Sequence, residues 1–419
     1  MTHGPLQVDK AHPQHFIYGD GARCFLMGYE ADWLMQIDQT PSDLARIKAL
    51  LDKIAGLGFN MVIVSSYSYA HLGRWGREEH EHDPKFVTPK IPPWVGGNAT
   101  PDYGRLDNEF FYHFDRIMVE LLKRGILAHI MIHVYNKEVC WPELGTADDD
   151  RYWRYLVARY QAFPNVIWDP AKEAYYQTPE YVWGRLGTIR SLDGYRRLLT
   201  VHDPNPPARR SQWYDPRKDL SDALVDFKSD QIHLDWYADA VRNYLAAQRP
   251  YVNVEYGYER GVEEVPTLNP LRMQHWREVL RRTWLVTMGG AYINYYYCNT
   301  AWSLFIPEPD PPGYSAHQLY RDFWSGTRYW LLCPDNTPLG EDTREGRYCR
   351  SNLGQEYVVF DETGQGFDLT ITDATAPLHA TWFNPVGGET VDAGILNNGK
   401  HSVVPPWGRG NWAVLHVRA

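Results

Sequence analysis

Cysteine is scarce in this chain, and the cysteines that are present do not form a recognisable framework. The sequence of 419 residues contains five, an odd number, at Cys24, Cys140, Cys298, Cys333 and Cys349. They are widely spaced, and none belongs to a Cys-x-x-Cys pair. The sequence therefore indicates neither a disulfide framework nor a zinc site, and we expect no cofactor.

Long apolar runs and an excess of positive charge are also missing. No stretch approaches 18 consecutive apolar residues, so no membrane-spanning helix is expected. Residues 1–8 lack the basic and apolar regions of a signal peptide, so we expect a cytoplasmic location unless a leader has been removed. The formal net charge of −10 argues against nucleic acid or a membrane surface as a partner. The composition leaves open whether the chain forms a homo-oligomer.

Aromatic residues, in contrast, are abundant. They make up 14% of the chain, with 17 Trp and 29 Tyr, while the 44% hydrophobic and 22% charged contents are ordinary for a globular protein. Many of these rings must belong to the core. Clusters at strand ends, such as residues 295–297, would also suit stacking on sugar rings.

A predicted strand followed by a helical pattern recurs eight times along the chain. The strands are expected at 25–29, 59–64, 126–134, 165–168, 198–203, 226–233, a run ending at Glu255, and 291–297. Alternation of this kind calls for a parallel sheet, and eight units predict closure into a (β/α)8 TIM barrel. A doubly wound open sheet is less favoured, because no Gly-x-Gly-x-x-Gly follows any of these strands.

The first two predicted helices carry clear start signals. In the first, we expect Thr40 as the cap, Pro41 at the first helical position and Asp43 inside the first turn. Asp107 is expected to cap the second.

The segment between these helices contains a long irregular stretch, residues 66–106, which we interpret as a substrate rim. Its histidines, His71, His80 and His82, lie among acidic residues and could suggest a metal cluster. A solvated hydrophilic loop explains them better, so no metal site is predicted.

The pattern of the sequence changes from about Cys333. Short alternating runs, such as 356–360, 367–371 and 413–417, are separated by Gly, Asn and Pro. This pattern predicts a small antiparallel β-sandwich. We therefore expect a catalytic barrel over residues 1–332 and a C-terminal β-sandwich domain over residues 333–419.

Two glutamates follow predicted strands. Glu173 comes shortly after the strand at 165–168, and Glu255 ends the strand that begins near Pro250. Barrel enzymes present catalytic acids in this way, at the carboxyl ends of their strands. Glu173 alone could simply cap the following helix, since an acid near a helix start is favourable. The second acid of the same kind favours a pair of carboxylates facing one site.

With both acids in place, the chain resembles a clan A glycoside hydrolase, and most closely the apiosidase-like family of putative glycoside hydrolases. The matching segments span most of the chain: 58–60, 164–169 leading into Glu173, 250–259, and 380–385 near the C-terminus. The resemblance implies a retaining mechanism with Glu173 as acid/base and Glu255 as nucleophile. It leads us to expect exo action on a small glycoside or oligosaccharide.

One departure from the family pattern leaves an alternative open. Clan A enzymes usually carry Asn before the acid/base, where it binds the sugar 2-hydroxyl, and this chain has Lys172. Lys172 either points away from Glu173, replaces Asn as a donor to the substrate, or recognises an acidic sugar. The missing Asn also makes a carbohydrate-binding protein on a degenerate hydrolase scaffold the alternative function. An inverting hydrolase is a lesser variant.

Further polar and aromatic residues follow the predicted strands, and on a barrel they would share one face. A hydrogen-bonded structural role is the competing interpretation for each histidine. The predicted substrate-binding residues are Asp32, Trp33, His133, Lys172, His202, His233, Tyr258, Tyr295 and Trp302.

Overall fold

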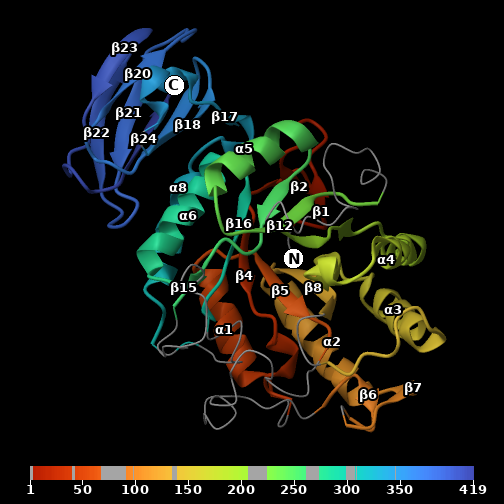
Figure 1. The fold of residues 1–419 in the computed structure, drawn as a ribbon. Coiled ribbons are helices and arrows are strands. Elements are labelled where there is room, and N and C mark those ends of the chain that lie inside the picture. Colours follow the sequence, from red (N-terminus) through yellow and green to blue (C-terminus); the bar gives the residue numbers. More distant parts are fainter. Residues whose placement is uncertain are drawn as a thin grey trace.

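The computed structural model describes residues 3–39, 43–67, 91–97, 99–134, 139–205, 224–260, 273–298, 307, 309–344 and 346–419. Two parts can be distinguished along the chain (Figure 1). A barrel of parallel strands surrounded by helices comes first, and antiparallel sheets follow at the C-terminal end.

The central sheet is parallel throughout and closes into a ring. Its order is β10-β9-β8-β5-β4-β16-β13-β12-β11, so β10 and β11 stand at its two ends. These two strands are separated by residues 200 and 201 alone and act as one position, which pairs with β9 on one side and with β12 on the other. The predicted TIM barrel is confirmed. The strands are β4 (Met27–Glu30), β5 (Met61–Ser65), β8 (Leu127–Val134), β9 (Val166–Lys172), β10 (Leu198–Leu199), β11 (His202–Asn205), β12 (Lys228–Ile232), β13 (Tyr251–Asn253) and β16 (Tyr292–Tyr295).

The barrel strands are buried on both faces. Every residue of β5 and of β8 is buried, as expected for parallel strands with side chains inside the ring and helices outside it. The outer helices are α1 (Ala45–Gly56), α2 (Asn108–Lys123), α3 (Ala147–Tyr160), α4 (Pro179–Leu192), α5 (Trp236–Ala247), α6 (Trp276–Met288) and α8 (Gly313–Ser325) (Figure 1). In the described part of the chain, no helix is long and apolar enough to cross a membrane.

The start of α1 differs from the prediction, whereas the start of α2 agrees with it. α1 begins at Ala45, so Asp43 lies before the helix and not inside its first turn. The predicted cap, Thr40, and Pro41 lie outside the described residues. The Asp38 carboxylate accepts the backbone N–H of Ile47 at 3.0 Å, an acceptor from outside the helix that no local pattern reveals. At α2, the Asp107 carboxylate accepts from Glu109 N as the sequence predicts.

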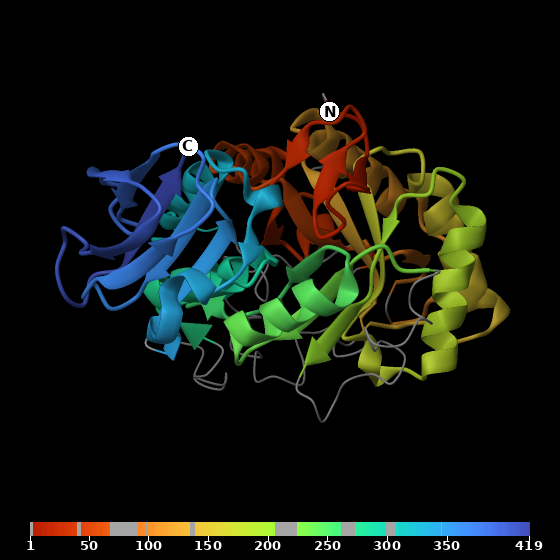
Figure 2. The ribbon, with the colours of Figure 1, turned by 90° about the horizontal axis from the view of Figure 1, so that it is seen from above.

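A small N-terminal sheet covers the amino end of the barrel. It consists of β1 (Leu6–Val8), β2 (Phe16–Tyr18) and β3 (Arg23–Cys24), all antiparallel. Phe16 packs edge-on against Phe227, which directly precedes β12, at a centroid distance of 5.2 Å. Figure 2 shows this sheet at one end of the barrel. The carboxyl ends of the strands therefore form the opposite end, which is the mouth.

The C-terminal part forms a six-stranded antiparallel sheet with a two-stranded sheet beside it. Alternate residues of β19 face opposite ways: Val359 packs in the core shared with Leu369 of β20, and Phe360 packs on the barrel. The strands are β17 (Cys333–Pro334), β18 (Arg347–Asn352), β19 (Glu356–Asp361), β20 (Phe367–Ile371), β21 (Leu378–Phe383), β22 (Thr390–Leu396), β23 (Gly399–Val403) and β24 (Ala413–Arg418). The antiparallel C-terminal sheets are as predicted, and the division at residue 333 stays a prediction.

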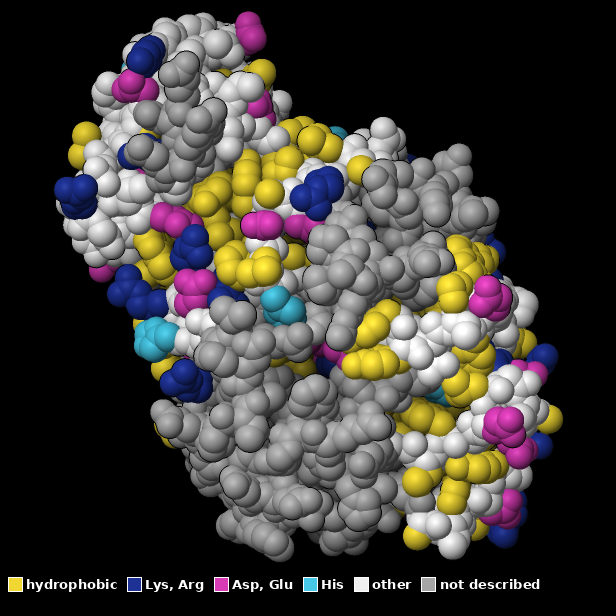
Figure 3. Space-filling model, in the orientation of Figure 1, with side chains coloured by type: hydrophobic (Ala, Val, Ile, Leu, Met, Phe, Trp, Pro, Cys, Tyr) yellow, Lys and Arg dark blue, Asp and Glu magenta, His cyan; other side chains and the backbone are white. Residues whose placement is uncertain are grey.

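Aromatic rings join this sheet to the barrel helices. Trp284 of α6 stacks on Phe360 at 5.5 Å, and Phe323 of α8 stacks on Phe383 at 5.0 Å. Apolar side chains gather beside this junction on the face drawn in Figure 3. Arg350 of β18 is 2% exposed and donates hydrogen bonds across the junction to the carbonyls of Leu332 and Thr287.

Candidate active site

Glu173 and Glu255 each follow a barrel strand at its carboxyl end. β9 ends at Lys172, and Glu173 is the next residue. β13 ends at Asn253, two residues before Glu255. The two glutamates are buried, with 6% and 2% of their surface exposed. The fold therefore presents two acids from two strands at the mouth of the barrel.

The backbone at Glu173 argues against a helix-capping role. Its φ is 54°, in the left-handed region that is uncommon for a residue other than glycine. Its side chain makes no cap hydrogen bond to the short 3-10 helix Ala174–Tyr176 that follows. α4 is capped instead by Thr178, whose hydroxyl accepts from Tyr181 N. Uncommon backbone conformations of this kind cluster at functional sites.

Lys172 stands at the centre of a cluster of three acids. Its Nζ lies 3.0 Å from Oδ2 of Asp32, 3.0 Å from Oε1 of Glu255 and 3.1 Å from Oε1 of Glu30. The hydroxyl of Tyr296 is 3.3 Å away. Burial works to lower the pKa of Lys172, but the three carboxylates hold it well above its usual value. The side chain is therefore an ammonium ion inside the barrel.

Glu255 is held ionised by its neighbours. Burial alone would raise the pKa of its carboxyl group, but Lys172 lowers it, and His202, Tyr258 and His233 add to this effect. The resulting pKa is about 2. Tyr258 donates a hydrogen bond to Oε2 at 2.5 Å, and Nε2 of His202 lies 3.6 Å from Oε1.

In the same cluster, the pKa of Glu30 is shifted in the opposite direction to that of Glu255. Burial raises its pKa well above the usual value; the Lys172 charge opposes this, while Asp32 and Glu255 reinforce it. Asn294 donates one hydrogen bond to Oε2 of Glu30 at 2.7 Å and another to the Val254 carbonyl at 3.1 Å, directly before Glu255.

Gly28 makes room for Asn294, because a Cβ at that position would lie 2.4 Å from its Oδ1. A glycine on β4 thus permits the amide that joins Glu30 to the segment carrying Glu255.

A second polar network lies next to this cluster. The Asp169 carboxylate accepts from the backbone N–H groups of Ala171 at 3.1 Å and His202 at 3.2 Å, and its other oxygen is 2.8 Å from Nε2 of His129. Burial lowers the pKa of His202 below its usual value, although the nearby Glu255 opposes the shift. This network fixes the end of β9, which carries Lys172 and leads into Glu173.

Aromatic side chains flank Asp32. Ser65 Oγ lies 3.4 Å from Oδ1 of Asp32 and 3.0 Å from the Tyr67 hydroxyl. The ring of Tyr67 packs edge-on against Trp33 and against Trp141, at 5.8 and 5.2 Å. His133 belongs to the same group, because it stacks on Trp141 at 3.9 Å.

The remaining predicted binding residues fall into three situations. The His233 ring lies 5.7 Å from that of Tyr258, on the Glu255 side of the site. Tyr295 lies elsewhere: its hydroxyl donates to Glu259 at 2.6 Å, and its ring packs against Tyr314. Trp302 lies outside the described residues.

Sequence reasoning missed several members of the site. Glu30 shares a strand end with Asp32 at a spacing of two, which would place both on one side of a strand, so a signal for it was present. Tyr296 was passed over for Tyr295, and on a strand a shift of one residue reverses the face. Nothing in the sequence pattern marked Trp141, because it follows β8 at a distance.

The described residues show no candidate metal site. They contain no group of three or more His, Cys, Asp or Glu side chains that could hold an ion. The histidines His71, His80 and His82, considered as a cluster in the sequence, lie outside the described residues.

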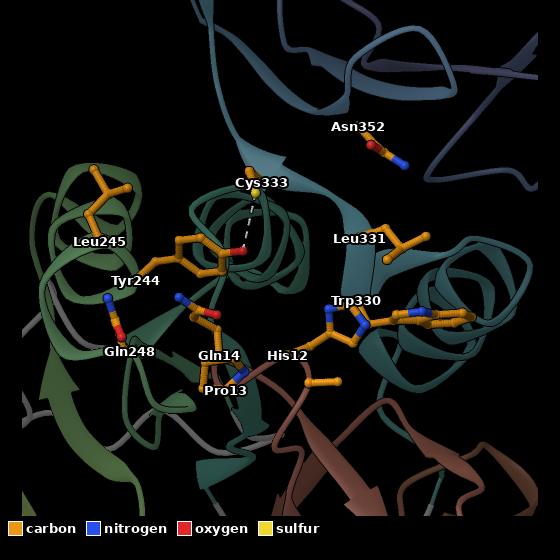
Figure 4. Close-up of a pocket in the computed structure, with 11 residues that line it drawn as sticks. His12, Pro13, Gln14, Tyr244, Leu245, Gln248, Trp330, Leu331, Cys333 and Asn352 are labelled. Carbon is orange, nitrogen blue, oxygen red and sulfur yellow. Dashed lines mark hydrogen bonds between the residues drawn. The ribbon is translucent and has the colours of Figure 1, made fainter.

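A cavity of about 390 Å³ lies away from these acids (Figure 4). It is lined by the N-terminal segment around His12, the end of α5 at Tyr244, and the chain around Trp330 and Cys333. The end of α5 leads into the start of β13, so the cavity lies towards the amino end of the barrel, opposite the mouth. Neither Glu173 nor Glu255 lines it.

Comparisons with solved structures show the same architecture. The chain superposes on a glycoside hydrolase with a TM-score of 0.76 at 16% identity, covering 99% of this chain and 97% of that one. A glycoside hydrolase family 5 protein from Bacteroides vulgatus ATCC 8482 gives 0.73 at 17% identity, with coverages of 99% and 93%. An endo-1,4-beta-mannanase from Rhizomucor miehei gives 0.54 at 13% identity, with coverages of 77% and 100%.

Sequence comparison identifies the family. No curated protein matches the chain. The model of the family described as apiosidase-like, catalytic domain, matches residues 11–330, which span the whole barrel. The chain therefore belongs to the apiosidase-like family and is a glycosidase, and its catalytic part is a TIM barrel.

Proposed function

We propose that this glycosidase retains anomeric configuration, with Glu255 as nucleophile and Glu173 as general acid/base. The observation that carries the proposal is the state of Glu255. Its pKa of about 2 keeps it ionised, although the side chain is 2% exposed. A nucleophilic carboxylate must be ionised when the sugar arrives, and it must be held in a fixed orientation.

Glu173 fits the complementary role because of where it stands in the chain. It directly follows Lys172, whose Nζ is 3.0 Å from Glu255, so the two acids belong to one small region of the mouth. An adjacent ammonium would normally favour ionised Glu173, but Lys172 is directed at the acids of its own cluster, with oxygens of Glu30, Asp32 and Glu255 within 3.1 Å of Nζ. Glu173 is the other strand-end acid of the mouth, and we therefore assign to it the role of the general acid that the reaction requires.

The reaction then proceeds in two displacements. Glu255 attacks the anomeric carbon while Glu173 donates its proton to the leaving oxygen, which gives a glycosyl-enzyme and a free alcohol. Glu173, now ionised, takes a proton from water, and this water displaces Glu255 from the same carbon. We expect the two carboxyl groups to stand about 5 to 5.5 Å apart, whereas inversion needs about 6.5 to 9.5 Å.

We propose exo action on a small glycoside. The buried aromatic side chains beside Asp32, which form a wall of the site, support this mode. Trp33 and Tyr67 are fully buried and pack against each other, and the Ser65 hydroxyl links Tyr67 to Asp32. A closed wall beside the acids would leave little room for a chain that extends past the cleaved sugar. The products released from a short oligosaccharide, followed over time, test this mode: single terminal residues are expected from the first minutes.

Two single variants test the roles of the acids. A dinitrophenolate leaves without a proton, so Glu173→Ala should still glycosylate quickly on a dinitrophenyl glycoside and then stall, because Glu173 also activates the water. A burst of phenolate with slow turnover, accelerated by azide, is the expected signature. Glu255→Ala should show no burst and lose several orders of magnitude of activity.

The same experiment can contradict the assignment in three ways. A burst in Glu255→Ala would reverse the roles, and identical behaviour of both variants on all substrates would refute them. If the wild-type protein turned over no member of a panel of aryl glycosides yet bound sugars, the alternative of a carbohydrate-binding protein on a degenerate scaffold would be correct.

A further inference from the structure

We infer that Lys172 is a positioning residue: it locks Glu255 and the two acids of the β4 end into one ion cluster, and it does not contact the substrate. The inference rests on the proposed function only in naming Glu255 as the nucleophile. This role differs from the two substrate-binding roles that the sequence left open for Lys172, namely a donor that replaces Asn and a ligand for an acidic sugar.

The first argument is a count of hydrogen-bond donors. An ammonium group has three N–H bonds and no acceptor. Nζ donates to Oε1 of Glu30 at 3.1 Å, to Oδ2 of Asp32 at 3.0 Å and to the Tyr296 hydroxyl at 3.3 Å, one for each of those bonds. Oε1 of Glu255 lies 3.0 Å from the same nitrogen as an ion-pair partner. No hydrogen is left for a sugar hydroxyl or for the carboxylate of an acidic sugar.

The second argument concerns access. Lys172 is 3% exposed, and its Nζ lies 5.3 Å from the centre of the Tyr296 ring, close enough for a cation–π contact. The Tyr296 hydroxyl is 3.3 Å from the same nitrogen. Carboxylates and an aromatic ring therefore enclose the ammonium group, and a substrate would have to displace one of them.

The third argument is electrostatic. The cluster joins acids that follow β4 and β13 to a lysine on β9, so removing Lys172 would leave buried carboxylates facing one another without a cation. Uncompensated buried charges are strongly destabilising, and the acids would take up protons to avoid them. The other groups around Glu255, namely Tyr258, His202 and His233, would not replace the full charge of Lys172.

Lys172→Met, which keeps the length of the side chain and removes its charge, tests the inference without a substrate. In this variant the pKa of Glu255 should rise above its unfolded-state value of about 4, and the pKa of Glu30, which burial already raises, should rise further. Acids with raised pKa values stabilise the folded form least at high pH. The deficit in melting temperature relative to wild type should therefore be small near pH 4 and grow towards pH 8.

Kinetics give an independent readout. The acidic limb of kcat/KM should move upward by about two pH units or more, because Glu255 must lose a proton before it can attack. Lys228→Met is the matched control, because this variant also removes the charge of a buried lysine. Lys228 lies on β12, is 5% exposed and pairs with Asp230 at 2.7 Å. The control variant should lower stability and leave the acidic limb where it is.

Three outcomes would overturn the inference. The first is a wild-type acidic limb in Lys172→Met together with a loss confined to KM, which would make Lys172 a substrate ligand. The second is a stability deficit of equal size at pH 4 and pH 8. The third concerns the double variant Lys172→Met/Glu30→Gln, which should regain stability because it has one buried acid fewer; no gain would refute the cluster.

These outcomes are separate from the fate of the proposed function. If wild type cleaved no glycoside, the proposed function would fail, while the melting temperatures would still decide whether Lys172 holds the cluster together. If wild type cleaved glycosides with retention and the stability deficit were independent of pH, the proposed function would stand and this inference would fail.

Discussion

Tyr258 donates its hydroxyl hydrogen to Oε2 of Glu255 at 2.5 Å, while Lys172 lies 3.0 Å from Oε1 of the same carboxylate. The two oxygens of the proposed nucleophile are thus held by two different partners. A hydrogen bond to an ionised acceptor is shorter and stronger than one between neutral groups. This arrangement fixes the plane of the carboxylate, which a side chain with a free terminal torsion would otherwise sample widely.

Replacing this hydroxyl should reduce activity without unfolding the protein. Tyr258→Phe removes one bond to a charged group, worth about 1.5–3 kcal/mol, so we expect kcat/KM on an aryl glycoside to fall about 10- to 100-fold. Tyr256→Phe is the control, because its buried hydroxyl bonds to Thr283 at 2.9 Å and not to an acid. Equal losses in both variants would mean that the bond to Glu255 has no special importance.

Tyr295 should matter for stability and not for substrate binding. Its hydroxyl bonds to Glu259 at 2.6 Å, and its ring packs on Tyr29, Phe59 and Tyr314. We expect Tyr295→Phe to lower the melting temperature by a few degrees, which corresponds to roughly 1 kcal/mol, with KM unchanged. A several-fold rise in KM at an unchanged melting temperature would instead support the substrate-binding role that the sequence predicts for Tyr295.

Glu259 gives the protein a pH-dependent stability that does not involve the proposed catalytic acids. Burial raises the pKa of its carboxyl group to about 7, although hydrogen bonds from Tyr295 and from Gly313 N oppose the shift. A raised pKa means that the folded state binds more protons than the unfolded state between about pH 4.5 and 7. The stabilising contribution is therefore complete below that range and is lost as the pH rises through 7.

Glu259→Gln removes this titration and keeps the shape of the side chain. We expect the melting temperature of the variant relative to wild type to increase between pH 5 and pH 8, because only wild type must ionise a buried acid. Glu180→Gln, at an exposed position on α4, is the control and should show no such trend. A difference between Glu259→Gln and wild type that is constant across this range would place the titration elsewhere.

The barrel could be read from the sequence because its signals are local and repeated. Eight alternations of strand and helix specify a closed parallel sheet almost regardless of detail. The prediction of the start of α1 was wrong for the opposite reason: the Asp38 carboxylate that accepts Ile47 N comes from the segment before the helix. Helix caps supplied from a distance leave no pattern in the helix itself.

The candidate site also contains features that the sequence could predict and features that it could not. Glu173, Glu255 and Asp32 follow strands and could be selected by that rule alone. The environment of Lys172 could not, because its three acidic partners come from two other strands of the ring. Tyr295 and Tyr296 are neighbours in a run of three tyrosines, and only the register of β16 decides which of them reaches Lys172.

The C-terminal sheet should be required for the stability of the barrel. Phe360 is fully buried and stacks on Trp284 of α6, so Phe360→Ala leaves a cavity at the junction and should cost about 3–5 kcal/mol. Val404→Ala, at a side chain that is 66% exposed in the same region, is the control and should change stability by less than about 0.5 kcal/mol.

Deletion of residues 333–419 should have a larger effect of the same kind. It uncovers Trp284 and Phe323, and it removes Arg350 from the carbonyls of Leu332 and Thr287. We expect the truncated barrel to aggregate or to melt well below the full chain, because a large apolar surface becomes exposed at the helices it covered. Thermal unfolding and size-exclusion chromatography measure both effects. A soluble fragment with full activity and an unchanged melting temperature would show that the sheet is an independent domain that the barrel does not need.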